Sequence, residues 1–248
     1  KGMLSHRDMR VRQEAQFALV EKGADGQRAL AEAAAQGKTL QARVHGIWGL
    51  GQLVQSSKFR VQSLAALRPL LVGAEVEVRA QAAKVLGDAR DAAAGAAITS
   101  LLRDSSPRVR HLAAIAAGKV RVPAAVPALV TLLAENADKD AVLRHSGVMG
   151  LLGCSDARSI AALKSHTSPS VRLAAVVALR RMERAEVSQF LTDADGRVIL
   201  EAARAISEIP IAQALPALAA LQPDFGKLTA DQRPALARRI LSANYRLG

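Results

Sequence analysis

The chain has 248 residues, and its 34 Lys and Arg against 22 Asp and Glu give a formal net charge of +12. Half of the residues are hydrophobic but only 2% are aromatic, so the apolar mass is largely Ala, Leu and Val, which suits close-packed helices. The lone Cys154 excludes a disulfide framework, a cysteine-built zinc site and a CxxCH haem attachment, and no run of about 18 apolar residues is present to span a membrane.

A helical pattern begins near the N-terminus and recurs along the chain. Each copy is aligned on one anchor position, and the anchors are Arg12, Arg43, Arg79, Arg110, Arg144, Arg172 and, in a seventh copy, Ile199. Their spacing of 27 to 36 residues accommodates two short helices and two turns. Three positions after each anchor the residue is Ala or Gly, and seven positions after it is usually Leu. These two positions share one helix face, so the pattern predicts helices that pack closely through small residues.

Each anchor helix follows another apolar-periodic stretch, such as residues 92–102 and 123–134, although the first copy lacks this leading helix. The pairs Ser106-Pro107 and Ser168-Pro169 predict helix starts, because serine is a favoured N-cap and proline is tolerated in the first turn. We therefore predict an all-α fold, an α-solenoid of about seven helix pairs in one repeat domain over residues 1–248. Residues 229–248 are expected to form a capping helix or a degenerate repeat.

The run Leu101-Leu102-Arg103-Asp104, followed after a turn by Val109-Arg110, resembles HEAT and HEAT-like repeats of the phycobilisome-lyase type. The resemblance implies that the anchor arginines form a structural ladder, in which each pairs with a turn aspartate and with carbonyls of a neighbouring turn. The candidate aspartates lie four to six residues before their arginines, at Asp8, Asp104 and Asp140.

Three segments, residues 8–17, 42–53 and 243–248, resemble the helical middle region of multidomain membrane-bound dehydrogenase-like proteins of planctomycetes and verrucomicrobia. Those proteins join a propeller similar to sugar dehydrogenases, HEAT repeats and a haem-binding c-type cytochrome domain. The resemblance implies a spacer or docking region of a larger redox protein, with a periplasmic or secreted location. It implies no cofactor within these 248 residues, because they contain neither propeller strands nor CxxCH.

The positions one, two and five after each anchor are expected to face solvent along a ridge on the concave side. Among these 21 positions the only cations are Lys84 and Arg204, and they are balanced by Glu14 and Glu201. A surface that grips several phosphates needs several Lys or Arg side chains, so the sequence disfavours nucleic acid on this ridge. A basic patch elsewhere on the surface stays open.

The ridge also predicts a protein partner. Position five is apolar in five of the seven copies, and with two histidines it gives a partner-binding ridge of Phe17, Trp48, His111, Ile115, His145, Met149 and Val177. An apolar stripe on a solvent-facing surface is typical of protein docking. The alternative is that curvature of the solenoid buries these side chains within the chain.

No catalytic, cofactor-binding or metal-binding residue is predicted. The sequence has no HExxH or GxSxG motif and no His followed by Glu, which leaves haem or metal ligation by His111 or His145 as the open alternative. Gly46, Gly49 and Gly51 indicate close helix contacts rather than a phosphate loop. Cys154 is expected to be either a reactive surface thiol or a small buried side chain.

The sequence therefore predicts a non-catalytic scaffold for protein interactions. The competing prediction is a HEAT-like enzyme or a nucleic-acid-binding module, similar to lyases or DNA glycosylases, that uses the concave groove.

Overall fold

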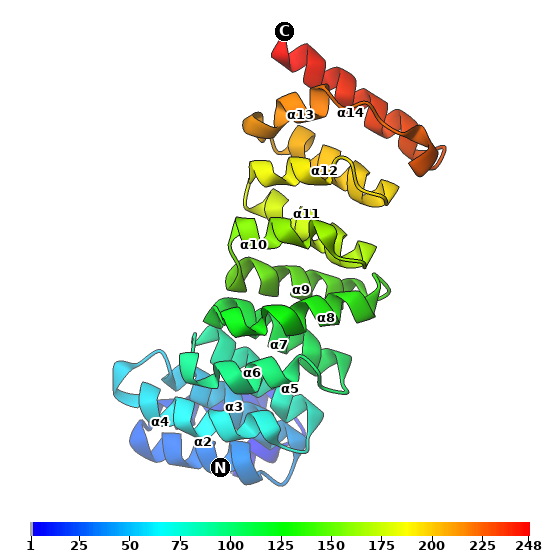
Figure 1. Ribbon diagram of the computed structural model, residues 1–248. Coiled ribbons are helices and arrows are strands. Elements are labelled where there is room, and N and C mark those ends of the chain that lie inside the picture. The colour runs from blue at the N-terminus through cyan, green and yellow to red at the C-terminus, as the bar shows by residue number, and fades with distance from the viewer. Residues whose placement is uncertain (1) are drawn as a thin grey trace. The chain divides into compact units, whose positions relative to one another are not determined.

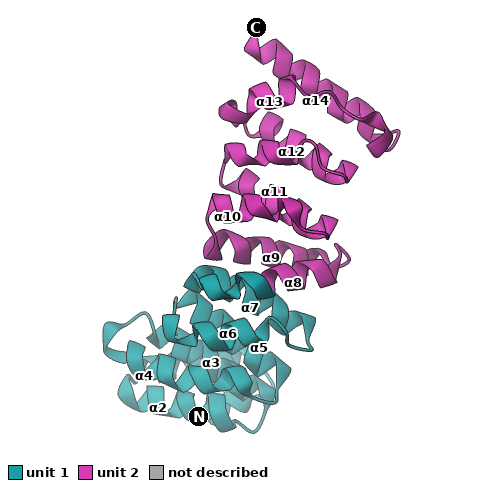
Figure 2. Cartoon of the chain, viewed as in Figure 1, with its two compact units in different colours: residues 1–128 teal, residues 129–248 magenta. Residues whose placement is uncertain are grey.

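The computed structural model describes residues 2–248 and confirms the predicted all-α solenoid, with no strand in that range (Figure 1). The helices divide into two compact units, residues 1–128 and 129–248 (Figure 2). Within residues 2–248, no helix has both the length and the apolar character that crossing a bilayer requires.

The first unit consists of antiparallel helix pairs. Its α-helices are α1 (Met9–Glu21), α2 (Ala24–Gln36), α3 (Leu40–Leu53), α4 (Ser57–Leu67), α5 (Val76–Asp88), α6 (Gly95–Leu101) and α7 (Pro107–Val120), with short 3₁₀ turns η1 (Gly2–Ser5), η2 (Arg68–Val72) and η3 (Ala92–Ala94). The anchor helices α1, α3, α5 and α7 are consecutive neighbours, and α2, α4 and α6 pack behind them. This order places equivalent faces of four helices side by side.

The second unit repeats this plan with shorter outer helices. The first unit ends with η4 (Pro123–Ala125), and α8 (Val126–Asn136) contains the boundary after residue 128. The second unit continues with α9 (Ala141–Cys154), α10 (Ala157–Ala162), η5 (Leu163–Ser165), α11 (Pro169–Arg181), η6 (Ala185–Phe190), α12 (Gly196–Glu208), η7 (Ala212–Ala214), α13 (Leu215–Ala219), η8 (Phe225–Lys227) and α14 (Gln232–Leu247). The helix within residues 229–248 packs against α12 and α13. Ile199, which replaces the anchor arginine on α12, is buried.

Small residues set how closely the helices approach, as their spacing predicted. A Cβ atom on Gly46 would lie 2.5 Å from the main-chain nitrogen of Ala34, and one on Gly49 would lie 2.5 Å from a methyl group of Leu30. A Cβ atom on Gly51 would lie 2.9 Å from Val85. These glycines therefore permit the contacts of α3 with α2 and α5 and belong to no phosphate loop.

The helix starts lie where the Ser-Pro pairs place them. Ser106 and Ser168 occupy the N-cap positions of α7 and α11, but neither side chain accepts the capping hydrogen bond. At α7 the side chain of Asp104 instead accepts a 2.8 Å bond from the main-chain nitrogen of Ser106. The sequence thus located both helix starts and both N-cap residues correctly, although neither serine hydroxyl makes a capping bond.

Four anchor arginines make the same pair of main-chain bonds. In each, Nη1 donates to the carbonyls six and five residues earlier: Arg12 to His6 and Arg7, Arg79 to Gly73 and Ala74, Arg110 to Asp104 and Ser105, and Arg172 to His166 and Thr167. Because the planar guanidinium carries five N–H donors, Nε and Nη2 stay available for a second partner. Each arginine therefore fastens its helix to the turn that precedes it.

The expected pairing of each anchor arginine with the aspartate that precedes its own helix is wrong. Arg79 pairs with Asp104, 25 residues later, and Arg172 pairs with Asp193, 21 residues later, each through two bonds of 2.8 to 3.1 Å. The pairing aspartate belongs to the turn before the next anchor helix, so the ion pair joins neighbouring repeats. Asp8 and Asp140 instead cap their own helices.

Arg43 and Arg144 depart from this pattern. Arg43 donates through Nε to the carbonyl of Ala34 at 3.1 Å, and so ties α3 to α2 without a carboxylate. Among residues 2–248, the guanidinium of Arg144 makes no hydrogen bond or ion pair, although the residue is half-buried. The anchor position is thus a site of helix fastening in most copies but not in all.

Candidate functional site

One face of the four anchor helices of the first unit lines a groove. The side chains on this face follow helical spacing: Met9, Gln13, Gln16 and Phe17 on α1, His45, Trp48 and Gln52 on α3, Gln81, Lys84 and Asp88 on α5, and Arg108, His111 and Leu112 on α7. Residues three, four and seven positions apart lie on the same side of a helix, so the sequence itself brings these side chains together.

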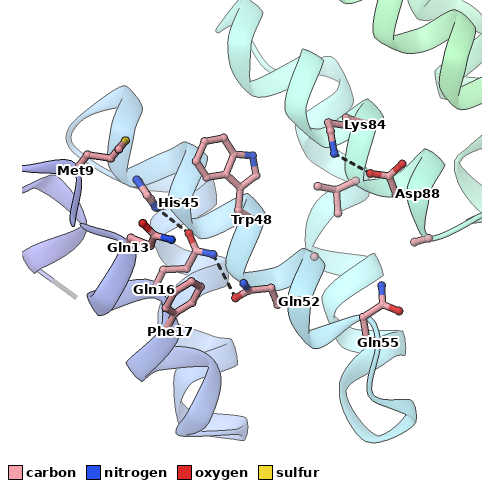
Figure 3. A pocket seen from close by; sticks show the side chains of 13 residues that line it. Met9, Gln13, Gln16, Phe17, His45, Trp48, Gln52, Gln55, Lys84 and Asp88 are labelled. Carbon is pink, nitrogen blue, oxygen red and sulfur yellow. Dashed lines mark hydrogen bonds and ion pairs between the residues drawn. The ribbon is translucent and has the colours of Figure 1, made fainter. Parts of the chain in front are cut away.

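Three hollows of about 540, 340 and 540 Å³ make up the groove, and Trp48 lines all of them. In Figure 3, Trp48 lies between the side chains of α1 and the Lys84–Asp88 pair of α5. Trp48 is 40% exposed, and Phe17 beside it is 36% exposed. The groove thus presents two aromatic rings to solvent among polar side chains.

Trp48 is fixed in place by its neighbours. Its indole Nε1 donates to Gln81 Oε1 at 2.9 Å, and Gln81 in turn donates to Glu77 at 2.8 Å. The ring of His45 meets that of Trp48 edge to face, with 5.2 Å between centroids. Because its polar edge is already bonded, Trp48 offers mainly apolar surface to anything that enters the groove.

A chain of hydrogen bonds joins four residues that line the groove. Arg12 Nε donates to His45 Nε2 at 3.3 Å, His45 Nδ1 donates to Gln16 Oε1 at 2.8 Å, and Gln16 Nε2 donates to Gln52 Oε1 at 3.2 Å. Burial, and secondarily the charge of Arg12, hold the pKa of His45 below its usual value of 6.5. This chain locks α1 to α3 with His45 in its neutral form.

The carboxylates of the groove are each bonded to cations. Glu77 accepts two hydrogen bonds from Arg108, which lower its pKa despite partial burial. Burial raises the pKa of Asp88, but its bonds to Lys119 and Lys84 outweigh that effect and lower it. Both carboxylates are therefore charged at neutral pH and already engaged.

The ridge residues expected in the first unit are placed as follows. Phe17 and Trp48 are exposed in the groove, while His111 and Ile115 are half-buried on α7. Phe17 and Trp48 line one hollow together, and Trp48 and His111 line another. None of the four is buried within the chain.

The remaining ridge residues lie in the second unit. His145 is exposed and Met149 is half-buried on α9, and Val177 is half-buried on α11. The docking role of these residues stays a prediction.

Part of the ridge is not exposed to solvent as expected. Val44, Ala80, Ser146 and Ala174, at positions one or two after their anchors, are buried, and so are His45 and Gln81. His45 and Gln81 are buried because they bond to the adjacent anchor helix, His45 to Gln16 on α1 and Gln81 to Trp48 on α3. Both still line the groove, which also includes positions five and nine. Position nine, which holds Gln52 and Asp88, was missed because neither residue is apolar or unusual in a helix.

Glutamines recur in the groove, and only Gln13 and Gln81 among them lie at the ridge positions expected from the sequence. Gln13, Gln16, Gln52 and Gln55 line one hollow, and Gln41 and Gln81 line the next. Glutamine carries no charge and occurs throughout helices, so its only signal would have been its recurrence on this one face.

The described residues offer neither a metal site nor an exposed thiol. Within residues 2–248, no group of three or more His, Cys, Asp or Glu side chains is placed to hold a metal ion. Cys154, the last residue of α9, is buried, which decides between the two expectations for it. The thiol is a small packing residue.

Comparisons with known proteins agree with this architecture. The family of HEAT repeats matches residues 64–151. The chain is similar in structure to YibA of Escherichia coli, with 17% identity, a TM-score of 0.54 and coverage of 96% of this chain and 90% of that one. At this identity the likeness shows the fold alone.

Two further similarities are more distant. An engineered protein gives 18% identity and a TM-score of 0.48, covering 98% of this chain and 76% of that one. Human deoxyhypusine hydroxylase gives 15% identity and a TM-score of 0.35, covering 94% of this chain and 99% of that one. No curated protein matches the sequence. The match to HEAT repeats thus covers residues 64–151, and the likeness to YibA shows a common fold over most of the chain.

Proposed function

We propose that this HEAT-like repeat protein is a non-catalytic scaffold that binds another protein through the groove of its first unit. The observation that carries the proposal is the exposure of Trp48 and Phe17, 40% and 36%, in a groove that spans four helices. Aromatic side chains in a hollow are the residues that most often dominate binding between proteins. The proposed role requires no cofactor.

The partner we propose is the c-type cytochrome domain of a larger redox protein. In this proposal the repeats form the helical spacer between that domain and a propeller similar to sugar dehydrogenases. The support comes from three segments, residues 8–17, 42–53 and 243–248, that resemble the helical region of such proteins. Two of these segments contribute Phe17 and Trp48, so the resemblance and the groove coincide.

The competing hypothesis, a HEAT-like enzyme or nucleic-acid-binding module in the same groove, is not favoured. The two groove carboxylates, Glu77 and Asp88, are bonded to Arg108 and to two lysines, so neither is poised to exchange a proton near neutral pH. Only three cations line the groove, and two of them are shared with these carboxylates.

A binding measurement tests the proposal. The chain is immobilised and titrated with a separately produced c-type cytochrome domain and with a propeller domain from a protein of the resembling class. We expect the cytochrome domain to bind, and Trp48→Ala or Phe17→Ala to weaken that binding at least tenfold, about 1.4 kcal/mol, as loss of a central anchor does.

Val61→Ala is the matched control, because Val61 is 74% exposed on α4 and does not line the groove. Absence of binding, or binding that Trp48→Ala leaves unchanged, would contradict the proposed function.

A further inference from the structure

We infer that the groove of the first unit binds an extended, acidic peptide segment of about eight residues, whose main chain pairs with glutamine side chains. This inference rests on the proposed function and specifies the chemistry of the partner. It follows from four properties of the groove: unused amide groups, length, charge and the placement of its aromatic rings.

The groove presents amides that nothing in the chain uses. The side-chain amides of Gln13, Gln41 and Gln55 are exposed and have no hydrogen-bond partner within residues 2–248, and the side chain of Gln52 is bonded only through its Oε1. Each amide offers donors and an acceptor, which is the complement of a peptide group. A helix would satisfy its own main chain and leave these side chains unmatched, whereas an extended segment presents free N–H and C=O groups along its length.

The length of the groove also suits an extended chain. It crosses α1, α3, α5 and α7, which are consecutive neighbours. Three steps between helices at about 8–10 Å each give roughly 24–30 Å, which about seven to nine extended residues would span at about 3.3 Å per residue. A small compact ligand would fill only one of the three hollows.

The charge of the groove favours an acidic segment. Its lining carries three cations, Arg12, Lys84 and Arg108, against two carboxylates. Both carboxylates are held by cations, since Glu77 pairs with Arg108, and Asp88 with Lys84 and with Lys119 from outside the lining. Arg12, by contrast, bonds only to carbonyls and to a neutral His45. An acidic ligand therefore meets uncompensated positive charge, while a basic one would have to compete with existing ion pairs.

Exposed apolar side chains of the groove would contact an extended chain. Successive side chains of a strand point to opposite sides, so every second residue of the segment would face the groove. Trp48 lies on α3 and lines all three hollows, and Phe17 and the 62% exposed Met9 lie on α1 and line one hollow together with Trp48. The segment is thus expected to place apolar side chains against these three residues and acidic ones near the cations.

A peptide library is the test. Random eight-residue peptides displayed on phage are selected on the intact chain, and recovered sequences are synthesised and titrated. Trp48 is the only tryptophan, so its emission reports occupancy of the groove directly. We expect recovered peptides to be enriched in Asp and Glu and to shift Trp48 emission. Methylation of alternate peptide nitrogens should weaken binding about tenfold, because it removes main-chain donors.

The double variant Gln13→Leu/Gln55→Leu isolates the role of the amides, and a labelled peptide measures its affinity by anisotropy. Neither side chain is bonded within the described chain, so the fold is expected to be unaffected, while binding should weaken about tenfold. The matched control is Gln36→Leu/Gln62→Leu, on exposed positions of α2 and α4, which should change nothing.

Recovery of no peptide, of basic or uncharged peptides, or of peptides indifferent to the Gln13/Gln55 variant would overturn the inference. A shift of Trp48 emission by neutral oligosaccharides but not by peptides would also overturn it. If the inference fails while a cytochrome domain still binds in a Trp48-dependent manner, the proposed function stands and only the extended, acidic mode is wrong. If both fail, the groove is no docking site.

Discussion

The ion pair between Arg79 and Asp104 is predicted to contribute strongly to the stability of the first unit. The two side chains are 13% and 8% exposed and share two hydrogen bonds, of 2.8 and 3.1 Å. Arg79 also holds the carbonyls of Gly73 and Ala74. Breaking a buried pair leaves one charge without compensation, so the loss exceeds what the same pair would be worth on the surface.

Asp104→Ala is expected to lower the free energy of unfolding by about 3–5 kcal/mol. Two lost bonds to charged groups at roughly 1.5–3 kcal/mol each give the same range, about 3–6 kcal/mol. The double variant Arg79→Met/Asp104→Leu should recover part of this loss, because an apolar pair leaves no buried charge. Recovery is incomplete because the carbonyls of Gly73 and Ala74 and the N–H of Ser106 lose their side-chain partners.

Urea denaturation followed by Trp48 fluorescence measures these energies. Trp48 lies on α3, next to the α5 helix that carries Arg79, so its emission reports unfolding of the first unit. Arg103→Ala, at the exposed neighbour of Asp104, serves as the control and should have no measurable effect. A loss below about 1 kcal/mol for Asp104→Ala, or purely additive effects of the two single changes, would refute the reasoning.

Three further predictions concern packing, pH and the thiol. Gly46→Ala should destabilise the protein by about 1–3 kcal/mol, measured as a lower thermal midpoint, because the new Cβ would meet the main chain of Ala34. Gly73→Ala is the control and should have little effect, since a Cβ there would lie 3.4 Å from the Leu70 carbonyl oxygen. His45 has a lowered pKa in the folded state, so the unfolded chain binds a proton at this residue more readily. The free energy of unfolding should therefore fall as the pH drops below 6.5. In urea titrations at pH 8 and pH 5, His45→Leu should remove that part of the pH dependence. Cys154 should react with a thiol reagent at the rate of unfolding rather than at the rate of an exposed thiol, and rapid reaction of the native protein would contradict its burial.

Much of the fold could be predicted because its packing depends on residue size at fixed intervals. Gly46 and Gly49 recur at the positions where Ala stands in other copies, and no larger side chain fits there. The partner of Arg79 could not be predicted in the same way. A pattern within one repeat favours the nearest aspartate, yet the bond crosses to Asp104 in the next repeat, a contact that only the stacking distance determines.

The candidate site was predictable only in its aromatic part. Trp48 and Phe17 stand out at an anchor offset that also holds apolar residues in other copies. Gln13 and Gln55 give no such signal, because an exposed glutamine in a helix and a bonded one look the same in sequence. These two glutamines matter because their side-chain amides face the groove without a bonding partner, and that is a property of the folded chain.

The net charge of the protein does not describe the charge of its binding surface, because many of its arginines hold the helices together. The Nη1 groups of Arg12, Arg79, Arg110 and Arg172 are all occupied by main-chain carbonyls, and two of these arginines are further paired with buried aspartates. On α5 one cation holds the fold together and a different one lines the groove. Arg79 fastens the helix, and Lys84, five positions later, lines the groove. Substitutions of anchor arginines that do not line the groove, such as Arg79, should therefore change stability without changing ligand preference, and substitutions of exposed groove residues should do the reverse. The charge that a partner meets is set by the few cations in the groove and not by the total of +12.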